Sequence, residues 1–229
     1  MGAKKLLRRI FKIKNKKEPR EHYWESYNRS FFIANKIKSL GLENCRLLDV
    51  GGEKLDNLFE KFGIKNITTV NILEDADIVA SAHKLPISDG SFEYVTCVDT
   101  LEHISKELRG QVVGELVRVA RKAVFIAAPV DSEENNRAEK FVLQYLPAAF
   151  VKEHRIFGLV DFNQIKSELE AMKKLGRIED IEEDSLDNLM SWVILMIGDK
   201  VEPSKLYKEL YFLENGLHPR RKALSIHLK

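Results

Sequence analysis

The chain has 229 residues, 44% apolar and 31% charged, which is enough to bury the core of one domain. No apolar run approaches the roughly 20 residues that span a bilayer, so an integral membrane helix is excluded. The first residues are basic but lack the apolar segment and cleavage site of a secretory signal, so we expect a cytoplasmic protein. The two cysteines, Cys45 and Cys97, lack metal-ligand spacing, so we expect reduced thiols, no disulfide and no metal site.

The charge is distributed unevenly. Residues 1–17 contain eight lysines and arginines and no acid, whereas the whole chain carries only +2, so the remainder carries −6. Residues 1–20 form a basic amphipathic tail, and a helix over residues 3–14 would place its apolar side chains on one face, as in peripheral contact with an anionic membrane. A solvated tail is an equally weighted alternative. Nucleic-acid binding is not expected, because basic stripes interleaved with aromatic residues are lacking elsewhere.

The first half of residues 21–229 predicts a strand–helix–strand unit. An amphipathic helix over residues 21–40 precedes a buried strand at 46–50, which runs into Gly51 and Gly52. A helical period over residues 54–62 and a β-branched run at 67–72 follow. This order is typical of a parallel βαβ unit.

The alternation continues along the chain. Strands are predicted at 77–80, 92–98 and 123–130, a helix at 105–120, further strands at 177–181 and 192–197, and a final helix near 204–214. Residues 131–176 are too long for a simple connection and are interpreted as an inserted helical cap. The expected fold is therefore α/β, Rossmann-like and doubly wound, with a mainly parallel seven-stranded sheet.

Two segments in the middle of the chain carry a more specific pattern. Residues 82–95 read AHKLPISDGSFEYV and residues 100–104 read TLEHI, about 30 residues after Asp49-Val50-Gly51. The segments resemble the motifs of class I S-adenosylmethionine-dependent methyltransferases of the type 11 kind. A weaker likeness, at residues 153–159, is to members that act in cell-surface or lipid pathways. The resemblance implies transfer of a methyl group from S-adenosyl-L-methionine to a small-molecule or lipid/glycan-linked acceptor.

The resemblance also assigns roles to residues after each strand. Asp49 would organise the cofactor loop, and the glycines would let the backbone approach the methionine part; Asn71 would face the ribose, and Ser81 the adenine. The implied cofactor-binding residues are Asp49, Gly51, Gly52, Asn71, Ile72, Ser81, Ala82, Val98 and Asp99.

Several of these positions depart from the family pattern. Glu53 and Leu55 stand where the second and third glycines of the loop belong, and Asn71 and Ser81 replace acids. Restoring an acid at 71 or 81 is therefore expected to tighten cofactor binding, since charge-assisted hydrogen bonds are stronger than neutral ones. The alternative function is a catalytically degenerate binding or scaffold module. A nicotinamide-dependent oxidoreductase is disfavoured, because Glu53 stands where its fingerprint needs glycine.

His103 and His154 are the candidate catalytic residues. His103 would act as a general base near the transferred methyl group, and His154 would help to hold an acceptor in the cap. A local capping or hydrogen-bonding role is the favoured alternative for both histidines. Methyl transfer needs little acid–base help, because positioning of the reactants does most of the catalytic task.

Overall fold

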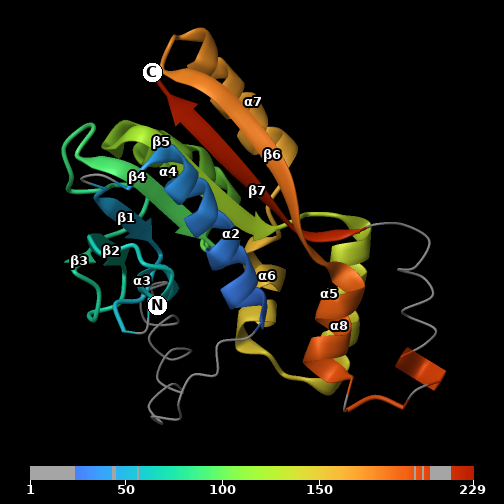
Figure 1. Cartoon of the computed structure of the whole chain (residues 1–229). Helices are drawn as coiled ribbons and strands as arrows, with labels where there is room; N and C mark the ends of the chain where they lie inside the picture. The colour runs from blue at the N-terminus through green and yellow to red at the C-terminus, as the bar shows by residue number, and fades with distance from the viewer. Residues whose placement is uncertain (1–23, 43–44, 56, 199, 203, 207–217) are drawn as a thin grey trace, which may run out of the picture.

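The structure is a computed structural model that describes residues 24–42, 45–55, 57–198, 200–202, 204–206 and 218–229 (Figure 1). The basic tail and most of the predicted helix near 204–214 lie outside these residues. The strands are β1 Leu47–Val50, β2 Ile67–Asn71, β3 Ile78–Val79, β4 Phe92–Val98, β5 Ala120–Pro129, β6 Ile178–Asn188 and β7 Pro219–Leu228. The helices are α2 Trp24–Leu40, α3 Leu58–Lys61, the short 3₁₀ helix η2 Leu101–His103, α4 Lys106–Val119, α5 Glu133–Tyr145, α6 Ala149–Phe157, α7 Phe162–Lys174 and α8 Leu189–Ile197.

A seven-stranded sheet organises the molecule, with the strand order β3-β2-β1-β4-β5-β7-β6. Strands β1 to β5 pair in parallel, and β7 runs antiparallel between β5 and β6. The predicted doubly wound, mainly parallel seven-stranded sheet is therefore confirmed. The order reverses between β1 and β4, and in such sheets ligands bind beyond the carboxyl ends of the strands at this point.

Alternate strand residues face opposite layers of helices. Leu48 and Val50 belong to a core with α4 and α7, whereas Leu47 packs on the other face with Ile33 and Ile37 of α2. Because side chains in a strand alternate with a period of two, continuous apolar strands bury both faces. This explains why β1, apart from Asp49, and the central part of β5 are apolar.

A third apolar cluster joins α5, α6 and α8 (Figure 1), which gather near the carboxyl end of β5. The segment 131–176, interpreted as a cap, contains α5, α6 and α7. Helix α7 packs on α4 and β6 in a layer that covers the sheet, whereas α6 lies against η2. Among the described residues no helix combines the length and apolarity needed to cross a bilayer.

Two predicted elements were wrong or incomplete, and one strand was not predicted. Residues 192–197 form part of helix α8 rather than a strand, because a buried apolar run lacks the periodicity that distinguishes the two. Strand β7 was missed, since its inward-facing Arg220 and Arg221 break the apolar pattern. The helix predicted over 54–62 is the single turn α3, whose N-cap is Asn57.

Candidate functional site

A tight turn follows β1 at the carboxyl edge of the sheet. Gly51 has a φ of +87°, which L side chains rarely adopt, and a Cβ at this position would overlap the side chain of Thr100. Thr100 in turn donates to the carbonyl oxygens of Val50 (3.2 Å) and Val98 (3.0 Å). The turn after β1 therefore lies directly against the turn after β4, and only glycine fits between them.

Asp49 supports the same turn from beneath. Its carboxylate accepts from Asn57 Nδ2 and Thr96 Oγ1, both at 2.8 Å, and a Cβ at Gly52 would overlap it. Burial raises the pKa of Asp49, and the two hydrogen bonds offset this only in part. With only 6% of its surface exposed, Asp49 shapes the backbone rather than presenting a carboxylate to a ligand.

Asn71, at the end of β2, is bonded to the turn itself. Its Nδ2 donates to the carbonyl oxygens of Gly51 (2.9 Å) and Gly52 (3.2 Å), and its Oδ1 accepts from Leu73 N at 3.3 Å. The side chain is thus part of the glycine turn, which the pattern of the sequence did not reveal. Its neighbour Ile72 is 52% exposed and offers an apolar surface beside the turn.

The positions assigned to adenine lie after β3. Ser81 Oγ is 2.7 Å from His83 Nδ1, and Ala82 packs partly buried against the core below α4. His83 was not among the predicted site residues. Ser81 and His83 therefore form a polar pair, and Ala82 between them packs against the apolar core.

Asp99, after β4 and the partly buried Val98, is held by two arginines. Arg221 Nε and Nη2 approach its two oxygens at 2.9 and 3.1 Å, and Arg29 Nη2 lies 2.6 Å away. Burial alone would raise the pKa of Asp99, but the charges of Arg221 and Arg29 outweigh it and hold this pKa well below its ordinary range. The backbone of Asp99 has a φ of +45°, a strained conformation of the kind that occurs at functional sites.

Neither arginine was predicted, because they approach from α2 and from the last strand. Arg221 also contacts Asp187 at 3.1 Å, so it connects the turn after β4 with the end of β6. Arg221 and Asp99 are 122 residues apart in the sequence, so a local motif cannot predict their contact.

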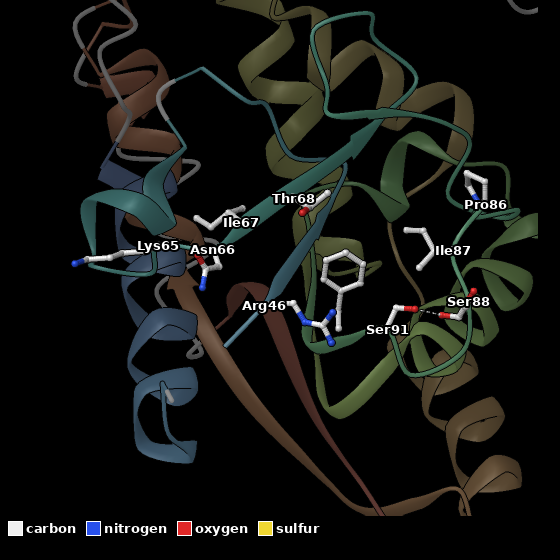
Figure 2. A pocket seen from close by; sticks show the side chains of 10 residues that line it. Arg46, Lys65, Asn66, Ile67, Thr68, Pro86, Ile87, Ser88 and Ser91 are labelled. Atoms are coloured by element: carbon white, nitrogen blue, oxygen red, sulfur yellow. Dashed lines mark hydrogen bonds between the residues drawn. The ribbon is translucent and has the colours of Figure 1, made fainter. Parts of the chain in front are cut away.

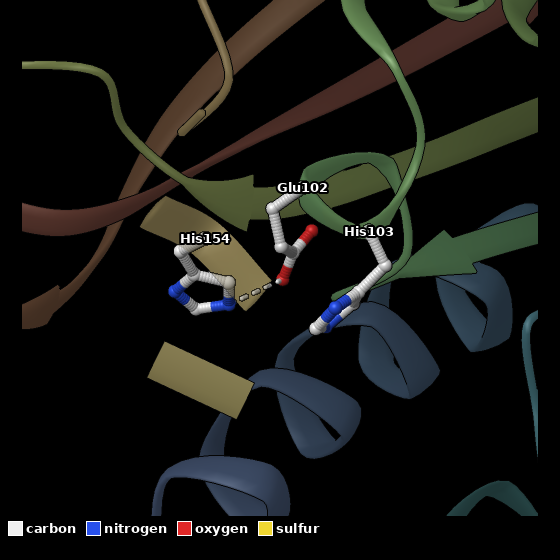
Figure 3. A group of neighbouring side chains, drawn as sticks. All are labelled: Glu102, His103 and His154. Carbon is white, nitrogen blue, oxygen red and sulfur yellow. Dashed lines mark ion pairs between the residues drawn. The ribbon is translucent and has the colours of Figure 1, made fainter. Parts of the chain in front are cut away.

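The two candidate catalytic histidines meet at the same edge of the sheet, although one lies in η2 and the other in α6. Their ring centroids are 5.2 Å apart, and the carboxylate of Glu102 lies near both rings (Figure 3). His103 Nδ1 lies 2.7 Å from Glu153, and His154 Nδ1 lies 2.7 Å from Glu139.

Charge compensates burial around these rings. Burial alone would lower the pKa of His103, but its hydrogen bond to Glu153 and the negative charge nearby outweigh this, so the pKa is raised. For Glu139, the hydrogen bond from His154 and the charge of Arg220 outweigh burial and lower the pKa. The sequence identified both histidines but not the acids that orient them.

A hollow of about 810 Å³ lies at the opposite edge of the sheet (Figure 2). Its lining includes Arg46 before β1, Asn66 before β2 and Ser91 before β4, which places it at the amino ends of these strands. We therefore assign it no part in the site described above. Cys45 and Cys97 are buried free thiols, as predicted, and burial raises the pKa of both.

Comparison with known proteins agrees with this arrangement. Residues 35–128 match the family model of a methyltransferase domain. A S-adenosylmethionine-dependent methyltransferase from Archaeoglobus fulgidus superposes with a TM-score of 0.55 at 15% identity, covering 89% of this chain and 97% of that one. One from Thermotoga maritima gives 0.51 at 16% identity, with 90% and 93% covered.

The same fold also occurs in a protein with another name. The [4+2]-cyclase SpnF superposes with a TM-score of 0.52 at 16% identity, covering 93% of this chain and 85% of that one. No curated protein sequence matches the chain. The predicted resemblance to class I methyltransferases is thus confirmed, by the family model for residues 35–128 and by the solved structures for the fold.

Proposed function

We propose that the chain is a S-adenosyl-L-methionine-dependent methyltransferase, because residues 35–128 match the model of a methyltransferase domain and solved methyltransferases share its fold. The acceptor would be a small molecule or a lipid- or glycan-linked group, bound between the turn after β4 and helix α6. When bound, S-adenosyl-L-methionine supplies a methyl group already activated on a sulfonium. The protein then has mainly to position two reactants, which accounts for a large part of such catalysis.

The glycine turn is the observation that carries this proposal. Gly51 and Gly52 are both prevented from bearing a side chain, one by Thr100 and the other by Asp49. The turn is therefore packed closely against Thr100 and Asp49, at the carboxyl edge of the sheet where ligands of such folds bind. A turn that served only to reverse the chain would need no such double restriction.

Other residues fit parts of the cofactor. The exposed apolar surface of Ile72 suits one face of a flat ring, and the hydroxyl of Ser81 suits a polar edge. The family pattern has a carboxylate that faces the ribose at position 71, and Asn71 Oδ1 is the acceptor that could replace it. This oxygen already accepts a hydrogen bond from Leu73 N. The fit is therefore better for the backbone and the ring than for the ribose hydroxyls.

A binding or scaffold module without catalysis is the second candidate, and two contacts favour it. The amide of Asn71 is turned toward the glycine carbonyls, and the carboxylate of Asp99 is neutralised by two arginines. Neither side chain then presents the free acceptor that the family pattern implies. The cyclase neighbour likewise indicates that this fold alone does not dictate methyl transfer.

Calorimetric titration of the full chain with S-adenosylmethionine and S-adenosylhomocysteine separates the two candidates. We expect both to bind to the wild type, and Gly51→Ala to abolish binding. Gly176→Ala is the matched control, because Gly176 has a similar φ of +80° but nothing within 4 Å of its Cβ position. Absence of heat at millimolar cofactor would favour the scaffold module, and equal affinity of the two variants would mean that the turn does not hold the cofactor.

A further inference from the structure

Three potential ligand atoms converge between η2 and α6. One ring nitrogen of His103, one of His154 and one carboxylate oxygen of Glu102 lie within 4.8 Å of one another (Figure 3). His154 Nε2 is 4.0 Å from Glu102 Oε1. Two ligands bound to one Zn²⁺ in tetrahedral geometry stand about 3.4 Å apart, so the three groups need to approach by about 1.4 Å at most.

Each imidazole is oriented by a carboxylate on its far nitrogen. Glu139 is hydrogen-bonded to Nδ1 of His154, and Glu153 lies 2.7 Å from Nδ1 of His103 as an ion-pair partner, which leaves the Nε2 of each ring for another partner. Metal-binding histidines almost always bond through the second nitrogen to a carboxylate, a carbonyl or water. Both rings therefore already have the outer contacts of metal ligands.

The orienting carboxylate of Glu139 is itself fixed. Arg220 Nη2 donates to its Oε1 at 2.8 Å and Nη1 donates to Asn135 at 3.0 Å, while the guanidinium carbon lies 4.0 Å from the ring centre of Trp192. Arg220 and Glu139 are fully buried. The position of His154 is thus determined by a chain of contacts from β7 to α6.

Glu102 is the part of the cluster whose bonding is incomplete. The residue is 1% exposed, and within the described part of the chain its Oε2 has no hydrogen-bond partner. Asp99 is compensated by Arg29 and Arg221, and Glu139 by Arg220. Among the described residues Glu102 forms an ion pair with His154, whereas Arg109 acts on it only through its charge. An unpaired buried carboxylate is costly, so a native protein that keeps one normally supplies it with a partner.

We propose that Glu102, His103 and His154 bind one divalent first-row transition-metal ion, with Zn²⁺ the most suitable. Two imidazoles and a carboxylate match such ions, whereas Mg²⁺ and Ca²⁺ prefer oxygen ligands throughout. Three protein ligands leave a coordination position for water or for an oxygen atom of a bound molecule. The His103 side chain is 29% exposed and provides a route for the ion.

Metal binding is tested without cofactor or acceptor, so its outcome is independent of the proposed methyl transfer. The untagged full chain, stripped with a chelator, is titrated with Zn²⁺ by calorimetry and with Co²⁺ by visible absorption. We expect one ion per chain and a Co²⁺ spectrum of nitrogen and oxygen ligation. Glu139→Gln, which loosens His154, should weaken binding about 10–100-fold, and Glu102→Gln should weaken it further.

His227→Gln is the control, because His227 lies on β7, 3.6 Å from Glu182 and with a side-chain exposure of 22%, yet outside the cluster. We expect it to bind Zn²⁺ as the wild type does. His103→Gln serves as the second ligand variant if thermal melting in chelator shows that Glu102→Gln does not fold. The proposal is overturned if neither Zn²⁺ nor Co²⁺ binds at millimolar concentration, or if the folded ligand variant binds as tightly as the wild type.

Discussion

For the variant Asn71→Asp, the family motif and the structure predict opposite changes in cofactor affinity. The family pattern expects the variant to bind cofactor more tightly, because a carboxylate accepts stronger hydrogen bonds from ribose hydroxyls than an amide does. In the structure, however, Asn71 Nδ2 donates to the carbonyl oxygens of Gly51 and Gly52. A carboxylate has no hydrogen to donate and would face two oxygens.

The magnitude follows from these two contacts. Each hydrogen bond contributes about 1 kcal/mol net, so their loss costs about 2 kcal/mol of stability and lowers Tm by about 4–8 °C for a chain of this size. A charge-assisted bond to the ribose would return about 1 kcal/mol. Binding is nevertheless expected to weaken, because the turn that would hold the cofactor is then no longer fixed by the amide of residue 71.

Thermal melting and calorimetric titration with S-adenosylhomocysteine measure both effects. Asn66→Asp is the control, since it makes the same change of charge at an exposed site before β2, at the opposite edge of the sheet. We expect the control to leave Tm and affinity unchanged. Tighter binding by Asn71→Asp together with an unchanged Tm would refute the reasoning, because the amide contacts would then not hold the turn.

The remaining predictions concern other parts of the chain. Asp99→Asn removes the carboxylate between Arg29 and Arg221, so unfolding in urea should show a loss of about 3 kcal/mol at pH 7. Because the pKa of Asp99 is lowered, its contribution is present above pH about 4 and is lost as the pH falls through the lowered pKa; a loss that shrinks already between pH 7 and 5 would contradict this. Gly114→Ala in the middle of α4 should raise stability by about 0.5–1 kcal/mol, since its Cβ would meet only Met172 Cε at an ordinary 3.9 Å; a lower Tm would show that the helix cannot accommodate it. Deletion of residues 1–17 should abolish co-sedimentation with anionic vesicles, and pelleting of the wild type should weaken with salt; equal pelleting of both forms would exclude the membrane contact.

Local patterns in the sequence were enough for much of the fold. The apolar runs of β1, β4 and β5, the helical periods of α2 and α4, and the glycine pair each depend on neighbouring residues, because secondary-structure periodicity and turn geometry are local properties. Prediction from the sequence pattern failed where the same run of residues is compatible with two kinds of secondary structure. The apolar run in α8 suits a buried helix as well as a strand, and the arginines that β7 buries disguise it as a polar segment.

Part of the candidate site could likewise be predicted from the sequence, and part could not. The sequence alone placed Gly51 and Gly52 after a strand and singled out His103 and His154, since each belongs to a short contiguous motif. Only the tertiary structure decided what these residues contact: Asn71 bonds to the turn, Arg221 reaches Asp99 across 122 positions, and Glu102 lies between two histidines on separate helices. Such contacts depend on how strands and helices pack, and packing joins residues whose separation along the chain carries no periodic signal.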